Sequence, residues 1–303
     1  MITASRVTIR EVALRDGLQS EKDFVPTDQK IQIIQSLSQA GVHYLETTSF
    51  VSPKAIPQLQ DAAELMARVE RGGIRHEIMV PNLKGARAAA KAGADQLIVF
   101  VSSSEAHNQA NVGRSIHSSL SDLDAIFGVA REHGIAVSAA IAVAFGCPYQ
   151  GKVPKEDVLD IAKHFAGRGV KRIALADTAG MANPVQITET ISFFAGQLPD
   201  VKLCLHLHNN RGVAMANLYA GYLAGVTMFD TSLGGIGGCP NVPQAAGNLA
   251  TEDVVYMFEA MGVKTNIDLP ALIEAARLLE TILQHPLPGQ VMKSGPAVSA
   301  PGQ

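Results

Sequence analysis

The sequence predicts an α/β protein folded as a single TIM (β/α)8 barrel, with about two extra helices at its C-terminal end. The first observation is a series of about eight short β-rich runs spread along the chain. The second is helical periodicity between these runs, because strict alternation of strand and helix implies parallel strands. The third is that 303 residues without a break in composition favour a closed barrel over an open doubly wound sheet.

The predicted elements follow one another from end to end. The strands are RVTIREV (6–12), HYLETTSF (43–50), HEIMVPN (76–82), QLIVFVSSS (96–104), AVSAAIAVAF (136–145), RIALADT (172–178), KLCLHLHN (202–209) and MFDTSLGG (228–235). Helical periodicity marks 27–41, 154–169 and 215–225, and several of these stretches end in a glycine suited to a helix C-cap. Two further helices are expected in 252–262 and 269–285. We expect one catalytic domain over 1–303, with 260–303 as a helical extension and tail.

Composition and charge exclude several classes of partner. The formal net charge is -3 and no basic block is visible, so neither nucleic acid nor a membrane surface is expected as a partner. The longest apolar run, 136–145, is too short to span a bilayer. Cys147, Cys204 and Cys239 are odd in number and form no CxxC pair, which favours a reducing compartment. With no apolar segment at the start, we expect a cytoplasmic protein.

Reactive side chains gather where the predicted strands end. In barrels of this kind the chemistry sits at the C-terminal ends of the strands. His206 and His208 are two residues apart on one strand, so both can point into the barrel mouth. The other residues at or after strand ends are Arg15, Asp16, Glu46, Asp177, Cys239 and Asn248.

The histidine pair suits a divalent cation. Asp16 comes from the first strand, which the barrel closes against the eighth and brings near the seventh. Two imidazoles, a carboxylate and open positions favour Mg2+ or Mn2+ over a structural zinc site, which usually uses cysteine. The alternative is a pair of hydrogen-bonded histidines at a strand end.

A glycine-rich loop, GGIGGCPN (234–241), follows the last strand. It does not fit GxGxxG, since Pro240 stands where the last glycine would fall, so a dinucleotide site is not supported. Its glycines could let the backbone approach a ligand or let the loop move. Cys239 is either catalytic or an inert small residue, and Arg15 either an ion-paired barrel arginine or a stabiliser of a developing oxyanion.

Seven segments in order resemble the 3-hydroxy-3-methylglutaryl-CoA (HMG-CoA) lyase family, a group of metal-dependent lyase and aldolase barrels. They are REVALRDGLQSEK (10–22), ETTSFVSPKAIPQ (46–58), VPNLKGARAA (80–89), GCPYQGKV (146–153), ADTAGMANP (176–184), HLHNNRG (206–212), and GGIGGCPN through GNLATEDVVYM (234–257). The resemblance implies cleavage of HMG-CoA to acetyl-CoA and acetoacetate with Mg2+ or Mn2+, an acyl-CoA substrate as partner, a homodimer, and a place in leucine degradation.

The resemblance also implies roles for individual residues. The metal ligands would be Asp16, His206, His208 and Asn248. Arg15 would stabilise the enolate oxygen, and Cys239 would take part in proton transfer. Glu46 and Asp177 would belong to the polar network of the site, and the expected substrate or CoA contacts are Lys22, Ser49 and Asn111. Either His206 or Asp16 could take the hydroxyl proton.

Four positions depart from the family pattern while all the proposed metal ligands are present. They are Gly113, Asn209, Asn241 and Gln244. Because these residues flank the expected site, a related 3-hydroxy-3-alkylglutaryl-CoA or another 3-hydroxyacyl-CoA is an alternative substrate. The further alternatives are a Claisen-type synthase, a pyruvate-dependent aldolase, and a non-catalytic acyl-CoA or metal-binding barrel.

Overall fold

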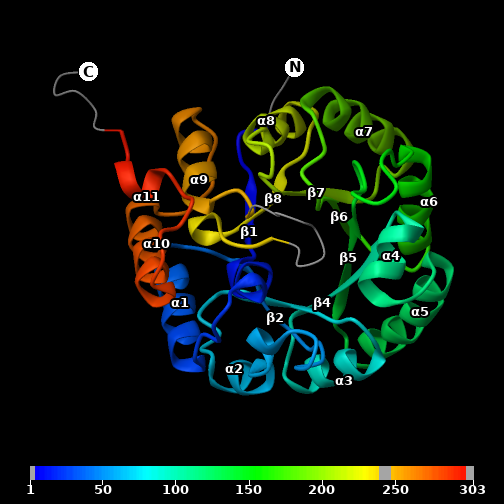
Figure 1. Ribbon diagram of the computed structural model, residues 1–303, viewed down its shortest axis with the longest axis horizontal. Helices are drawn as coiled ribbons and strands as arrows, with labels where there is room; N and C mark the ends of the chain where they lie inside the picture. Colours follow the sequence, from blue (N-terminus) through cyan, green and yellow to red (C-terminus); the bar gives the residue numbers. More distant parts are fainter. Residues whose placement is uncertain (1–3, 239–246, 298–303) are drawn as a thin grey trace.

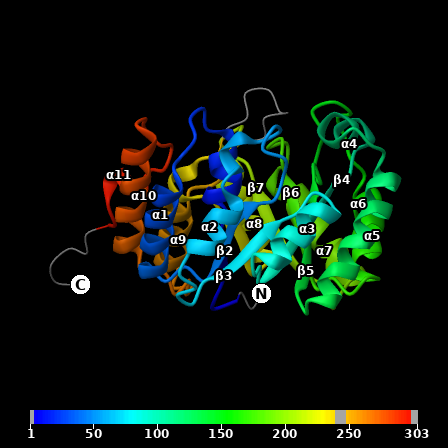
Figure 2. The same cartoon turned by 90° about the horizontal axis from the view of Figure 1, so that it is seen from below.

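The chain forms a closed barrel of parallel strands inside a ring of helices, as predicted (Figures 1 and 2). The computed structural model describes residues 4–238 and 247–297. The strands are β1 (Thr8–Glu11), β2 (Tyr44–Ser49), β3 (Arg75–Met79), β4 (Gln96–Ser102), β5 (Ala136–Ala142), β6 (Arg172–Asp177), β7 (Lys202–Leu207) and β8 (Met228–Thr231). Each predicted strand is confirmed, and pairing of Arg10 with Asp230 between β1 and β8 closes the barrel.

Helices connect the strands on the outside of the barrel (Figure 1). Asn82, Ser104, Ser115, Asn183 and Asp268 each accept a hydrogen bond from the backbone at the start of a helix, which fixes where five of these helices begin. The helices are α1 (Thr27–Gln39), α2 (Ala62–Arg68), α3 (Leu83–Lys91), α4 (Glu105–Val112), α5 (Ile116–Glu132), α6 (Lys155–Ala166), α7 (Pro184–Gln197), α8 (Ala214–Leu223), α9 (Thr251–Ala260), α10 (Leu269–Leu283) and α11 (Val291–Ser294).

Two expectations about boundaries need correction. β1 ends at Glu11, so Arg15 and Asp16 lie on a short helical turn, η1 (Ala13–Gly17), rather than at the end of the strand. The Val12 carbonyl accepts hydrogen bonds from the amides of Asp16 and Gly17, which coils the chain immediately after the strand. β8 likewise ends at Thr231, and the turn η4 (Leu233–Gly235) follows it, with Gly234 at a φ of 66°.

The apolar core lies between the strands and the surrounding helices, whereas the interior of the barrel beneath the site is charged. Phe165, Phe194, Phe229 and Phe258 are fully buried in the outer layer. α10 packs against α1 and α9 on one side of the barrel (Figure 1). Inside the barrel, the buried Arg10 pairs with both Asp230 and Glu77. This network closes the floor beneath the site.

No helix within the described residues is long and apolar enough to cross a membrane.

Candidate active site

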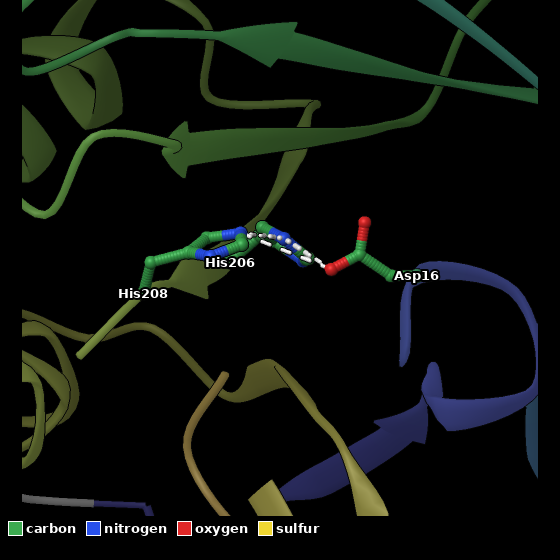
Figure 3. Close-up of side chains that lie close together, drawn as sticks. All are labelled: Asp16, His206 and His208. Carbon is green, nitrogen blue, oxygen red and sulfur yellow. Dashed lines mark hydrogen bonds and ion pairs between the residues drawn. The ribbon is translucent and has the colours of Figure 1, made fainter. Parts of the chain in front are cut away.

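Asp16, His206 and His208 meet at the C-terminal end of the barrel, as the sequence indicated (Figure 3). The Nε2 atoms of the two histidines lie 3.0 Å apart, and Asp16 Oδ2 lies 3.7 Å from Nε2 of His206 and 3.8 Å from Nε2 of His208. All three side chains are buried. Ligand atoms that converge within 4.8 Å of one another form a site able to hold one metal ion.

Two elements, β7 and η1, bring the triad together. His206 lies on β7, and its ladder partner on β8 is Asp230. His208 follows the end of β7 and is held by an antiparallel bridge to Asn248. Asp16 comes from η1, which follows β1 on the far side of β8. The closure of the barrel therefore brings Asp16 into one cluster with histidines 190 and 192 positions further along the chain.

Asn248 lies beside the triad and could add a fourth donor. Its Nδ2 donates to Asp16 Oδ2 at 2.7 Å and to the Ile236 carbonyl at 3.2 Å. Its Oδ1 is buried and has no hydrogen-bond partner among the described residues. A buried carbonyl oxygen is rarely left unpaired. Two imidazoles, a carboxylate and an amide oxygen fit a divalent cation such as Mg2+ or Mn2+.

A second carboxylate orients His206. Asp230 Oδ2 lies 3.2 Å from His206 Nδ1, and Asp230 also accepts hydrogen bonds from Arg10. A carboxylate on the far nitrogen of a histidine fixes the ring and leaves Nε2 for a metal. Burial would raise the pKa of Asp230, but Arg10 and His206 hold it far below its ordinary value. Asp230 therefore stays charged.

Neighbouring groups shift the pKa values of Asp16 and His206 in opposite directions. Burial alone would raise the pKa of Asp16, but Arg15, His206, His208 and the hydrogen bond from Asn248 lower it to about 2. Burial alone would lower the pKa of His206, but Asp230 and Asp16 raise it above the ordinary value. The carboxylate is thus ionised across the physiological range.

Arg15 is fixed beside the triad. Its Nε donates to Glu46 Oε1 at 2.5 Å and its Nη1 donates to Asp16 Oδ1 at 2.8 Å. Burial alone would lower the pKa of Arg15, but Glu46 and Asp16 raise it. The guanidinium is therefore charged and held in one direction at the cavity wall.

A cavity of about 350 Å³ opens beside these groups. Of the sequence-predicted residues, it is lined by Arg15, Asp16, Glu46, Ser49, Asn111, His206 and His208. Lys22 is exposed and does not line it. Asp177 does not line it either, because its carboxylate accepts the amides of Met181 and Ala182 and so holds the loop after β6. Burial raises the pKa of Asp177 to about 6.

Two of the departures from the family pattern, Asn209 and Gly113, have local structural roles. Asn209 Oδ1 accepts the amide of Ala214 at the start of α8, and Gly113 ends α4 with a φ of 70°. Cys239, Asn241 and Gln244 lie outside the described residues.

Sequence reasoning missed several residues of the cavity wall, among them the polar residues Asp230, Arg10, Gln19 and His107. Asp230 and Arg10 lie on strands that were predicted, so the period-2 alternation could have placed both inside the barrel. Gln19 donates to Asp16 Oδ1 at 2.9 Å and follows Arg15 within one predicted motif. His107 lines the cavity from α4, where its Nδ1 lies 2.6 Å from Ser102 Oγ. Nothing in its sequence pattern singled it out.

The fold and the site define a parallel barrel with a candidate divalent-metal centre at the C-terminal ends of its strands. The HMGL-like family matches residues 6–279, and the chain belongs to this family.

The chain is similar to proteins that are named as acyl-CoA lyases. The chain is 40% identical to hydroxymethylglutaryl-CoA lyase of Bacillus subtilis, over 95% of this chain and 98% of that protein. It is also 40% identical to (R)-citramalyl-CoA lyase of Chloroflexus aurantiacus, over 96% of this chain and 95% of the relative. A solved HMG-CoA lyase from Acinetobacter baumannii, in complex with coenzyme A and 3-methylmalate, matches with a TM-score of 0.94 and 40% identity, covering 99% of this chain and 98% of that one.

Proposed function

We propose that this chain is a divalent-metal-dependent carbon–carbon lyase that cleaves (S)-3-hydroxy-3-methylglutaryl-CoA to acetyl-CoA and acetoacetate. The observation that carries the proposal is the meeting of Asp16, His206 and His208 with the fixed cation of Arg15 at one cavity. Support comes from relatives named HMG-CoA lyases that match nearly the whole chain at 40% identity.

Four side chains are proposed to hold the metal. Asp16, His206 and His208 would supply a carboxylate oxygen and two Nε2 atoms, and Asn248 would supply its unpaired Oδ1. When bound, Mg2+ or Mn2+ would act as a Lewis acid on the tertiary hydroxyl of the substrate. Asp230 would keep the ring of His206 oriented for this role through its contact with Nδ1.

Arg15 is proposed to stabilise the enolate. Breaking the C2–C3 bond leaves its electron pair on the acetyl-CoA fragment, where negative charge develops on the thioester oxygen. Because Glu46 and Asp16 already hold the guanidinium, it needs no reorganisation when that charge appears. Glu46 thus acts through Arg15 as a positioning residue.

Two proton transfers complete the reaction. His206 and Asp16 both line the cavity, where either could take the hydroxyl proton. Cys239 is proposed to return a proton to the enolate carbon. Cys239 follows β8 in the sequence and lies outside the described residues.

The remaining contacts are proposed from position. Ser49 and Asn111 line the cavity and are assigned to the acyl group or the thioester arm. Lys22, which is exposed, is assigned to CoA, and the coenzyme A bound to the solved Acinetobacter relative supports an acyl-CoA substrate. Asp177 would act indirectly by holding the loop after β6.

The deciding experiment follows acetoacetate and acetyl-CoA from HMG-CoA, with and without Mg2+ or Mn2+. We expect metal-dependent cleavage that is lost in His206→Ala and kept in His133→Ala, which removes an exposed histidine at the end of α5. If folded, metal-loaded protein forms neither product, the HMG-CoA assignment is wrong.

One comparison favours a second candidate substrate. The (R)-citramalyl-CoA lyase relative matches at the same identity and over slightly more of the chain than the Bacillus enzyme. The same assay with (R)-citramalyl-CoA, read out as pyruvate, tests this candidate. A higher kcat/KM than for HMG-CoA would reassign the substrate.

Three further expectations stay predictions. The first is a homodimer, and light scattering tests it. The second is a cytoplasmic location, and cell fractionation tests it. The third is the choice between Mg2+ and Mn2+, and metal titration tests it.

A further inference from the structure

The cavity has two chemically different sides. The side formed by β1, β7, β8 and η1 carries the charged groups, among them Arg15, Asp16 and His206. The opposite wall comes from β4, β5 and β6. Beside Ile98 it consists of Phe100, Ala140, Ala142, Ala174 and Ala176. We call these five residues the alanine wall. None of them carries a charge or a side-chain hydrogen-bonding group.

The alanine wall is continuous and adjoins the metal triad. Strand pairing joins Phe100 to Ala140 and Ala140 to Ala174. Ala176 pairs with His206 in the next ladder. A group attached to an atom held at His206 can therefore reach the wall directly.

Alanine is an unusual choice at these positions. The interior of an eight-stranded barrel is normally filled by bulky branched side chains. Ala140 and Ala142 line the cavity from inside a closed barrel and are only half-buried. Below them the Arg10–Asp230–Glu77 network closes the interior. The methyl groups of Ala140 and Ala142 therefore face open space in the cavity, whereas Ala174 is buried against Cys204 and Met228.

We propose that the alanine wall is a subsite for an alkyl substituent on C3 of the acyl group, larger than the methyl of HMG-CoA. This proposal rests on the proposed lyase function, because it places the C3 hydroxyl at the triad. The substrate class is 3-hydroxy-3-alkylglutaryl-CoA, with ethyl or propyl at C3. A carboxylate finds no partner on this wall, whereas an alkyl group buries apolar surface there.

The reaction needs no additional reactant. The hydroxyl proton leaves to the base, the C2–C3 bond breaks, and its electron pair forms the enolate of acetyl-CoA. The enolate carbon then takes one proton, and the other product is the 3-oxo acid that keeps the alkyl group. Substrate and products thus balance as they do for HMG-CoA.

Binding tests the subsite separately from catalysis. The probes are 3-methyl-, 3-ethyl- and 3-propylglutaryl-CoA, which lack the hydroxyl and cannot be cleaved, and calorimetry with metal present gives their Kd. We expect the affinity of the wild type to rise about fourfold with each methylene buried. Ala140→Leu fills the wall and should reverse this order, whereas Ala136→Leu, at the exposed start of β5, should keep it. Ala142→Val is the milder filling variant if Ala140→Leu does not fold.

Cleavage of the matching 3-hydroxy thioesters completes the test. We expect the ratio of kcat/KM for the propyl substrate to that for HMG-CoA to fall at least about tenfold in the filling variant, since two methylenes lose their site. Wild-type affinity that is flat or falls with chain length overturns the subsite, even if HMG-CoA is cleaved. Rising affinity that the filling variant reverses supports the subsite, and absence of any cleavage would then count against the lyase function alone.

Discussion

Asp230 is the residue that connects the metal triad to the charged floor of the barrel. One carboxylate oxygen faces His206 Nδ1, and both oxygens accept hydrogen bonds from Arg10. Cys204 Sγ donates to Oδ1 at 3.0 Å, so the carboxylate is held on several sides. A histidine whose far nitrogen is fixed in this way presents its near nitrogen in one direction. The orientation of His206 thus depends on a side chain outside the triad.

Asp230→Asn is expected to weaken Mg2+ or Mn2+ binding by about 10- to 100-fold, because an amide orients the imidazole less well than a carboxylate. Competition with a fluorescent chelator measures the affinity. Asp61→Asn is the matched control, since Asp61 is also buried and ion-paired, with Lys30 Nζ at 2.6 Å, but lies outside the barrel. It should lower stability and leave the metal Kd unchanged. Equal metal affinity in wild type and Asp230→Asn would contradict the positioning role.

Arg15→Met is expected to lower kcat by about 10²- to 10³-fold, because the variant loses a preorganised cation at the enolate oxygen. Arg15→Lys should recover only part of the rate, since lysine lacks the planar fork that Glu46 and Asp16 hold. Steady-state kinetics with HMG-CoA measure both. Arg168→Met, which removes a surface ion pair with Asp124, is the control and should keep full activity. Activity of Arg15→Met within a factor of about ten of wild type would count against the enolate role.

At the scale of elements, the site depends on two short turns that follow β1 and β8. η1 carries Arg15 and Asp16, and the segment after η4 packs against Asn248. Gly237 has a φ of 121°, and a Cβ there would lie 2.6 Å from Asn248 Nδ2. Glycine is therefore required both by the backbone and by the close approach to a proposed ligand.

Gly237→Ala should weaken metal binding by about tenfold or more, because the new methyl group displaces the Asn248 amide. It should also lower the free energy of unfolding by about 1–3 kcal/mol through backbone strain. Gly225→Ala is the matched control: its φ is 102°, but a Cβ meets nothing within 4 Å. The control should share the loss of stability and keep the metal Kd. If both variants bind metal like the wild type, the packing of Gly237 against Asn248 has no part in the site.

The strands and the histidine pair were predictable because both depend on local periodicity. Alternation placed His206 and His208 on one face, and eight strand–helix units implied the closure that brings Asp16 beside them. The helical turn that carries Asp16 could not be predicted, because coiling after Glu11 depends on hydrogen bonds to Val12 that no sequence pattern marks. Register between strands is equally invisible in one sequence. The alignment of Ala140 with Phe100 and Ala174 therefore emerged only from the structure.

At the scale of the whole molecule, buried charge is distributed in two layers. The barrel floor pairs its ions, as Arg10 does with Asp230 and Glu77. Behind the site, Glu11 and Glu252 are buried carboxyls without a cation among their main interactions. Glu11 accepts hydrogen bonds from the amides of Ala13 and Leu233, and so joins the segments after β1 and β8. Glu252 Oε2 accepts the amide of Gly234, while Oε1 has no partner among the described residues.

These two carboxyls make stability depend on pH. Burial raises the pKa of Glu11 to about 7 and that of Glu252 to about 8, from an ordinary value of 4.5. At a pH between 4.5 and the raised pKa of each group, the carboxyl keeps a proton in the folded chain that it has released in the unfolded chain. The free energy of unfolding contributed by Glu11 therefore falls as pH rises from about 5 to 7, and that contributed by Glu252 falls from about pH 5 to 8. Each falls by at most about 1.4 kcal/mol for each pH unit.

Glu252→Gln should remove the part of this loss that belongs to Glu252, because glutamine is neutral at every pH. The stability of the variant relative to wild type should rise steadily from pH 5 to pH 8, as the wild-type carboxyl is forced to ionise in a buried site. Urea unfolding at pH 5, 6.5 and 8 measures the difference. Glu132→Gln, at the exposed end of α5, should show a difference that does not change with pH. A flat difference for Glu252→Gln would mean that its carboxyl is ionised in the folded chain throughout this range, with a compensating partner that the described contacts do not include.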